Sequence, residues 1–192
     1  MDVDKKNVDI FFALFSNKST SQQTQIPPTT LNSTDEPKRS ADNGDAEPMY
    51  KHAVKLQCGD GIAINKLEAA RCYKMAADKG HINAMIAYAN MLYEGDVIAV
   101  NKKEAARYYK VAADKGIEGA MSSLALMLYK GDVIAINKVE AARYYKMSAD
   151  RGNVCSMYNH GYFLFSGEGV AVNKREAARY YRLLSDQGNI EA

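Results

Sequence analysis

Few side chains in this sequence could act as a general base, a nucleophile or a soft metal ligand. The 192 residues include three histidines and three cysteines. No histidine stands near a cysteine or a carboxylate at a spacing typical of a metal site or a catalytic triad. We therefore predict that the chain is not an enzyme, and that it holds no cofactor and no metal ion.

The short glycine- and aspartate-containing segments do not complete a nucleotide or calcium motif. The Gly-Glu-Gly segment from Gly167 gives the backbone freedom for a turn, but the Gly-Lys-Ser/Thr of a phosphate loop does not follow it. Asp60, Asp96 and Asp132 lack the alternating oxygen ligands of a calcium-binding loop. These segments are therefore expected to be turns.

Cysteine placement and charge exclude several classes of protein. Cys58, Cys72 and Cys155 are odd in number and show no regular spacing, which argues against a disulfide framework and favours a cytoplasmic protein with reduced thiols. The 25 basic and 23 acidic side chains are interspersed, so neither nucleic acid nor a membrane is an expected partner. No apolar run reaches the roughly 20 residues that span a bilayer.

One sequence pattern occurs four times and organises the chain. The copies begin at Asn65, Asn101, Asn137 and Asn173, so each start follows the previous one by 36 residues. A strict period of this length without insertions is typical of stacked helical repeats. The sequence therefore predicts an all-α solenoid of about four helix-loop-helix repeats.

The second helix of each repeat is marked at both ends. Asn101 and Glu104 have the spacing of an N-cap residue and its capping-box partner, and Gly116 stands where a left-handed residue ends a helix. Equivalent residues recur in the other copies. Alanines and one tyrosine, here Tyr109, share the predicted buried arc, so we interpret the Arg-Tyr-Tyr pattern as packing rather than as a nucleic-acid stacking motif.

The first helix of each repeat carries the candidate binding residues. The positions that differ between copies fall within one arc of roughly 100° on the helical wheel. Repeat proteins use such a surface to contact an extended ligand, although a solvent-facing stripe without a ligand is the alternative. The predicted partner-binding residues are Ile86, Asn90, Glu94, Ser122, Leu126, Lys130, Tyr158, Asn159 and Tyr162.

The histidines fit this frame as structural residues. His52 and His160 occupy the repeat position of Tyr88 and Leu124 on the packed side, so both are predicted to be buried in the core. His81 follows the end of a helix, where the helix dipole would favour a cation.

Residues 1–48 differ in composition from the repeats. From residue 17 onward they are rich in Ser, Thr, Gln, Asn and Asp, and they contain all four prolines, so we expect a disordered tail. The apolar cluster from Val8 to Phe15 is either a docking motif or a terminus without a role, and the charges before it are a poor start for a signal peptide. Sequons at Asn17 and Asn32 matter only if the chain is secreted. The repeats are placed at 49–80, 81–116, 117–152 and 153–188, with the start of a fifth at 189–192.

The fourth repeat carries a recognisable family pattern. Its residues are Ser156, His160, Gly161, Leu164, the Gly-Glu-Gly-Val segment from Gly167, Glu176, Ala177, Tyr180, Tyr181 and Gly188. They resemble a Sel-one-like repeat, a relative of the tetratricopeptide repeat. The resemblance covers residues 49–192. It departs from the family pattern at His160, where Leu is usual, and at the Asp-Val pairs of the middle loops.

The resemblance implies a right-handed α-α superhelix that serves as a scaffold or adaptor, with a protein or peptide partner in a groove lined by the first helices. An endoplasmic-reticulum adaptor of a ubiquitin ligase is one alternative, which the poor signal sequence disfavours. A self-associating structural protein is another. Self-association would use the second helix of the fourth repeat, where we expect Ala177, Tyr181 and Leu184 to lack a covering helix.

Overall fold

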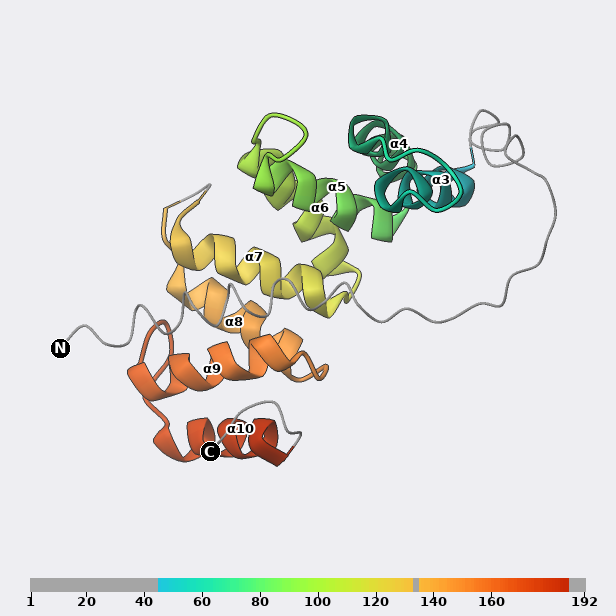
Figure 1. Cartoon of the computed structure of the whole chain (residues 1–192). Helices are drawn as coiled ribbons and strands as arrows, with labels where there is room; N and C mark the ends of the chain where they lie inside the picture. Colours follow the sequence, from blue (N-terminus) through green and yellow to red (C-terminus); the bar gives the residue numbers. More distant parts are fainter. Residues whose placement is uncertain (1–44, 133–134, 187–192) are drawn as a thin grey trace. The chain divides into compact units, whose positions relative to one another are not determined.

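The computed structural model describes residues 45–132 and 135–186, and the regular secondary structure within these residues is α-helical (Figure 1). The tail up to residue 44 and the start of a fifth repeat at 189–192 lie outside the described residues. The helices are α3 (Ala46–Cys58), α4 (Lys66–Asp78), α5 (Ile82–Glu94), α6 (Lys102–Asp114), α7 (Glu118–Lys130), α8 (Lys138–Ala149), α9 (Val154–Ser166) and α10 (Lys174–Asp186). The predicted all-α repeat fold is therefore confirmed.

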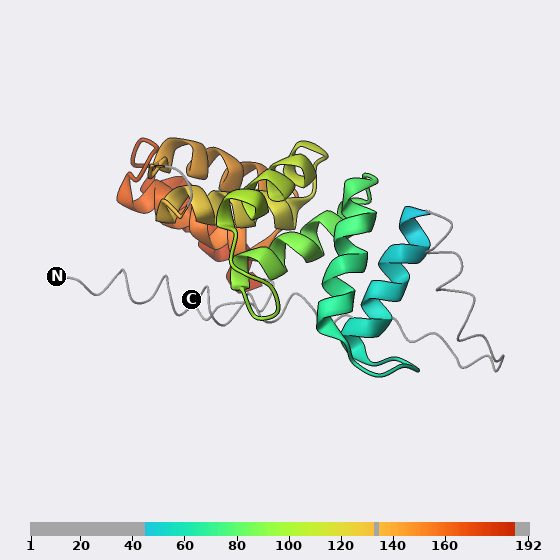
Figure 2. The same ribbon diagram turned by 90° about the horizontal axis from the view of Figure 1, so that it is seen from above.

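Contacts divide these helices into two compact units. The first unit contains α3 to α7 and the second contains α8 to α10, so the boundary falls inside the third repeat. In the first unit, α3 and α4 lie side by side as a hairpin (Figure 2). In the second unit, α9 lies between α8 and α10 (Figure 1). Helix α3 begins at Ala46, three residues before the repeat boundary predicted at residue 49.

The second helices are capped as predicted. The side-chain oxygen of Asn101 accepts a hydrogen bond from the Glu104 N–H at 3.1 Å, and the Asn101 amide donates to the Glu104 carboxylate at 3.0 Å. Asn65 and Asn173 accept the equivalent backbone bond at 3.1 Å. An N-cap of this kind stabilises a helix by about 1 kcal/mol. The capping therefore fixes where each of these three helices starts.

Tyrosines of the second helices fill the core between the alanines. Tyr73, Tyr109 and Tyr145 are buried, as the helical wheel predicts. Alanines such as Ala112, which is 0% exposed, let neighbouring helices approach closely. Ser148 stands at the same repeat position as Ala112, and its buried hydroxyl oxygen accepts a hydrogen bond from the Ser156 hydroxyl at 2.7 Å.

The last second-helix, α10, is covered on one side. Ala177 and Leu184 are buried, so the expectation that they lack a cover is wrong: both face α9, which already packs on α10. Tyr181 is half-buried and Ala178 is exposed. Ala142, at the repeat position of Ala178, is 1% exposed.

An ion pair links each repeat to the next. Lys102, the first residue of α6, contacts Asp132 in the loop of the following repeat at 2.6 Å. Tyr93 donates its hydroxyl to the same carboxylate at 2.9 Å, and the Lys102 ammonium lies 5.3 Å from the Tyr93 ring centroid. Burial alone would raise the pKa of Asp132, but the bonds from Lys102 and Tyr93 hold it below its ordinary value. Burial and the bond to Asp132 raise the pKa of Tyr93 to about 12.

The histidines have structural roles, although not all of those predicted. His160 is buried beside the edge of the Tyr180 ring, as expected, whereas His52 is half-buried. His81 caps the start of α5: its Nδ1 accepts from the Ala84 N–H at 3.1 Å, and its Nε2 lies 2.8 Å from Glu47. His81 therefore links the start of α5 to α3, a contact that the sequence analysis did not predict.

We expect Lys102→Met to lower the free energy of unfolding by about 1 kcal/mol, because it removes a charged donor from a half-buried carboxylate. Lys66→Met is the matched control, since Lys66 pairs with Asp96 at 2.9 Å in the same position. The Asp96 side chain is 66% exposed and that of Asp132 is 15% exposed, so the control should lose less. Urea denaturation of both variants measures the difference, and equal losses would contradict this ranking.

Stability should depend on pH through His160. Burial lowers the pKa of this histidine and Lys146 lowers it further, against the opposing effects of Glu176 and Asp150. The unfolded state therefore binds a proton more readily, so stability is present in full above the ordinary pKa of about 6.5 and is lost as the pH falls below it. His160→Leu, which copies Leu124 of the third repeat, should flatten the thermal melting profile between neutral and mildly acidic pH. An unchanged profile would show that other groups cause the loss.

Candidate partner-binding face

The residues that vary between repeats form what we call the variable face of the first helices. In the first unit this face carries three residues of α5 and three of α7. They are Ile86, Asn90, Glu94, Ser122, Leu126 and Lys130. All six are at least partly exposed, and Asn90, Glu94 and Lys130 are exposed. The structure therefore leaves these predicted residues accessible.

A buried tyrosine hydroxyl forms a hydrogen bond with a residue of this face. Tyr109 of α6 donates to the Asn90 side-chain oxygen at 2.5 Å and also bonds Ser123 on α7. Burial raises the pKa of Tyr109, so its hydroxyl stays protonated and can donate. Tyr73 makes a comparable bond to Gln57 of α3 at 2.7 Å. The second helices thus reach the first helices through their tyrosines and fix polar side chains beside the variable face.

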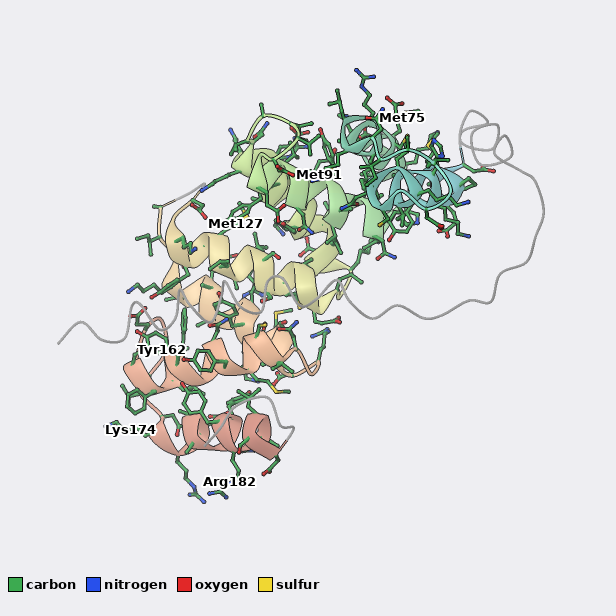
Figure 3. The ribbon with its side chains drawn as sticks, viewed as in Figure 1. Met75, Met91, Met127, Tyr162, Lys174 and Arg182 are labelled. Atoms are coloured by element: carbon green, nitrogen blue, oxygen red, sulfur yellow. The ribbon has the colours of Figure 1, made fainter. Side chains whose placement is uncertain are left out.

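The second unit presents an aromatic version of the same face. Tyr158 and Tyr162 of α9 are half-buried, and Tyr162 is labelled in Figure 3. The Tyr158 ring centroid lies 5.7 Å from that of Tyr181 on α10. Gly161 makes room for this packing, because a β-carbon there would lie 3.1 Å from the Tyr181 ring. Burial also raises the pKa of Tyr181, so this hydroxyl is neutral. The surface offers ring faces and neutral hydroxyl groups.

Asn159 does not belong to the accessible surface. Its side chain is 3% exposed, which corrects the sequence-based grouping with Tyr158 and Tyr162. Successive side chains on a helix differ in direction by about 100°. Asn159 follows Tyr158 directly and can therefore face the packed side of the helix. Asn159 is therefore a core residue.

The variable face offers groups of several kinds for contact with another chain. It combines an acid, a base, amides, hydroxyls and apolar groups, which suit hydrogen bonds and packing with another chain. Within residues 45–132 and 135–186, no three His, Cys, Asp or Glu side chains gather as metal ligands. None of the helices in this described part is long and apolar enough to cross a membrane.

Two features escaped the sequence analysis. The Tyr109 hydroxyl was expected only to fill space, yet it joins α5 and α7 through Asn90 and Ser123. The ion pair between repeats was also missed. Its signal is present in the sequence, because the lysine after each of the first three repeat-starting asparagines is followed 30 residues later by an acid, as in Lys102 and Asp132.

Comparisons with known proteins fit this geometry. The sequence matches the Sel1 repeat at residues 49–81, 82–117, 119–153 and 156–189. The chain is similar to a Sel1 repeat protein from Oxalobacter formigenes, with 25% identity and a TM-score of 0.75 over 80% of this chain and 63% of that one. It is also similar to c5321, a protective antigen present in uropathogenic Escherichia coli strains, which displays an SLR fold. That match has 23% identity and a TM-score of 0.77 over 83% of this chain and 34% of the other.

The chain thus spans less than two thirds of the length of either protein. No curated protein sequence matches it. Proteins built from Sel1 repeats are generally protein–protein interaction scaffolds, and the fold is typically non-catalytic. With four matched repeats that cover most of its length, the chain belongs to the Sel1 repeat family.

Proposed function

We propose that this chain is a non-catalytic scaffold that binds an extended segment of a protein partner along the variable face. The observation that supports this proposal most is that the first and second helices differ in how much they vary between repeats. The second helices keep the same caps and ion pairs from repeat to repeat, whereas the first helices present different accessible side chains at equivalent positions. A surface that differs at each repeat can recognise a partner sequence step by step.

The chemistry of the variable face indicates what such a segment contains. Glu94 on α5 and Lys130 on α7 occupy the same repeat position with opposite charge. Ile86 and Leu126 add apolar contacts, and both are half-buried. The fitting partner carries a basic group, an acidic group and apolar side chains in between. This pattern gives specificity through complementary charges more than through total charge.

The outer side of the second helices is a weaker candidate, because its charges are already paired within each helix. Three equivalent lysine–aspartate pairs occupy it at distances between 2.6 and 3.0 Å. They are Lys74–Asp78, Lys110–Asp114 and Lys146–Asp150. A partner on that side would meet the same lysine–aspartate pair in each of these three helices. Such a surface offers no contact that differs between repeats.

The tyrosines of α9 are the proposed affinity anchors. Tyrosine is enriched among the interface residues that cost most binding energy when truncated. Tyr162 contacts Phe163 of its own helix with ring centroids 6.3 Å apart, so its orientation is supported before a partner arrives. We also propose a cytoplasmic location, which agrees with the lack of a disulfide among Cys58, Cys72 and Cys155 in the described part of the chain.

A site-specific photo-cross-linker tests the proposal in the cell that makes the protein. A photoreactive phenylalanine analogue replaces Ile86, Ser122 or Tyr162 one at a time, and mass spectrometry identifies what is captured. We expect the three positions to capture the same partner through different, ordered stretches of its sequence. The matched controls carry the analogue at Arg71, Arg107 or Arg143, which are exposed on the second helices.

The controls should capture that partner at least tenfold less efficiently, since a cross-linker reacts only with groups in contact. Capture of one partner mainly from the arginine positions would overturn the assignment of the variable face. Thermal melting of each labelled chain shows whether a loss of capture reflects unfolding.

A further inference from the structure

The ion pair between repeats recurs with the same geometry wherever two described repeats follow one another. A lysine at the start of a second helix contacts an acid in the loop of the next repeat. The pairs are Lys66–Asp96 at 2.9 Å, Lys102–Asp132 at 2.6 Å and Lys138–Glu168 at 3.0 Å. Each pair therefore marks a junction between a repeat and its successor.

Lys174 is one half of such a junction. It begins α10 and occupies the repeat position of Lys102 and Lys138. Its ammonium lies 5.5 Å from the ring centroid of Phe165, as that of Lys102 lies 5.3 Å from Tyr93. Among the described residues, however, Lys174 has no carboxylate in contact. The lysine and its aromatic neighbour are thus arranged as in the junction between Lys102 and Asp132 described above.

Asp60 is the complementary half. It occupies the repeat position of Asp96, Asp132 and Glu168 in the loop between α3 and α4. Asp60 is exposed, and it makes no ion pair within the described part of the chain. The first loop therefore presents the acid that every later loop uses to contact the preceding repeat.

The glycine after this acid strengthens the match. Gly169 follows Glu168, and a β-carbon there would lie 2.2 Å from the Lys138 backbone oxygen, because the loop rests directly on the start of α8. Gly61 follows Asp60 with nearly the same backbone angle, a φ of 72° against 71°. Among the described residues, no atom lies within 4 Å of a β-carbon placed at Gly61. The Asp60–Gly61 loop has the shape that fits against the start of a second helix, and that place is open.

Helix α10 offers the accessible surface for such a contact. Ala178 is exposed, whereas Ala70 and Ala142 at the same repeat position are 2% and 1% exposed. Arg182 points from α10 away from α9 (Figure 3). This side of the second helix is covered in α4 and α8, so the exposed side of α10 has room for the loop of another molecule.

We propose that the chain associates head to tail, with the Asp60–Gly61 loop of one copy on the start of α10 of a second copy and with Asp60 paired to Lys174. The two halves differ, so the contact is heterologous and adds copies in one direction. The occupant is a second copy of this chain, selected by charge and by the glycine that allows close approach. This self-association is independent of partner binding on the variable face.

Charge reversal tests the pairing in the intact chain. Sedimentation of the unmodified chain over micromolar to millimolar concentration should show mass that grows with concentration. Lys174→Glu or Asp60→Lys alone should weaken association roughly tenfold, because attraction becomes repulsion. An equimolar mixture of the two variants should associate again, since each junction then joins opposite charges. The double variant should also associate.

Neither change should alter the melting temperature by much, because neither side chain has an ion-pair partner within the described chain.

Lys103→Glu is the matched control. Lys103 is exposed in the first turn of α6, one position after the residue that corresponds to Lys174, so the substitution makes the same change in net charge close to the start of a second helix. It should leave association unchanged. The proposal is overturned if the chain stays monomeric throughout, if all three single variants weaken association equally, or if mixing the complementary variants restores nothing.

Discussion

The contact between one repeat and the next is the constraint on which the rest of this structure depends. A helix hairpin with one apolar side is not stable alone, and its stability comes from the repeat stacked on it. Here each such contact is fixed at the start of the second helix by a lysine and an acid 30 residues later, as between Lys102 and Asp132. Where the loop comes closest, at Gly169, only a glycine fits against the backbone of α8. The strict period of the sequence follows, because an insertion would move the acid away from its lysine.

This constraint explains why variation is confined to the first helices. The second helices supply the cap, the lysine and the buried tyrosine, and each of these groups has a partner elsewhere. Tyr109 shows the coupling most clearly, since its hydroxyl fixes Asn90 on one first helix and bonds Ser123 on the next. Apart from Asn90, the variable-face residues of α5 and α7 are not part of this bonding between helices. They can change without loss of the fold, and a binding surface can therefore be built there.

Sequence patterns predicted the local features well and the long-range ones poorly. The caps at Asn65, Asn101 and Asn173 were predictable because both partners lie within three residues of each other. The helical wheel did not predict the burial of Asn159. This residue lies at the edge of the varying arc, where a neighbouring helix decides whether a side chain is buried.

Contacts between helices account for the other differences from the sequence-based expectations. Ala177 and Leu184 are buried because they face α9, the partner helix within their own repeat. His81 joins α3 to α5 through Glu47 and the Tyr50 ring, which stacks at 4.4 Å. These contacts join residues of different helices. No pattern within a single helix reports them.

The most direct measurement is the affinity of the captured partner for a chain in which only the variable face of α9 is changed. Tyr158→Ile together with Tyr162→Asn copies the residues that the second repeat has at these positions, Ile86 and Asn90. Isothermal titration should show binding weakened by roughly tenfold or more, as expected for the loss of two aromatic anchors, while the helical content is retained. Unchanged affinity in the folded variant would contradict the claim that recognition lies on the first helices.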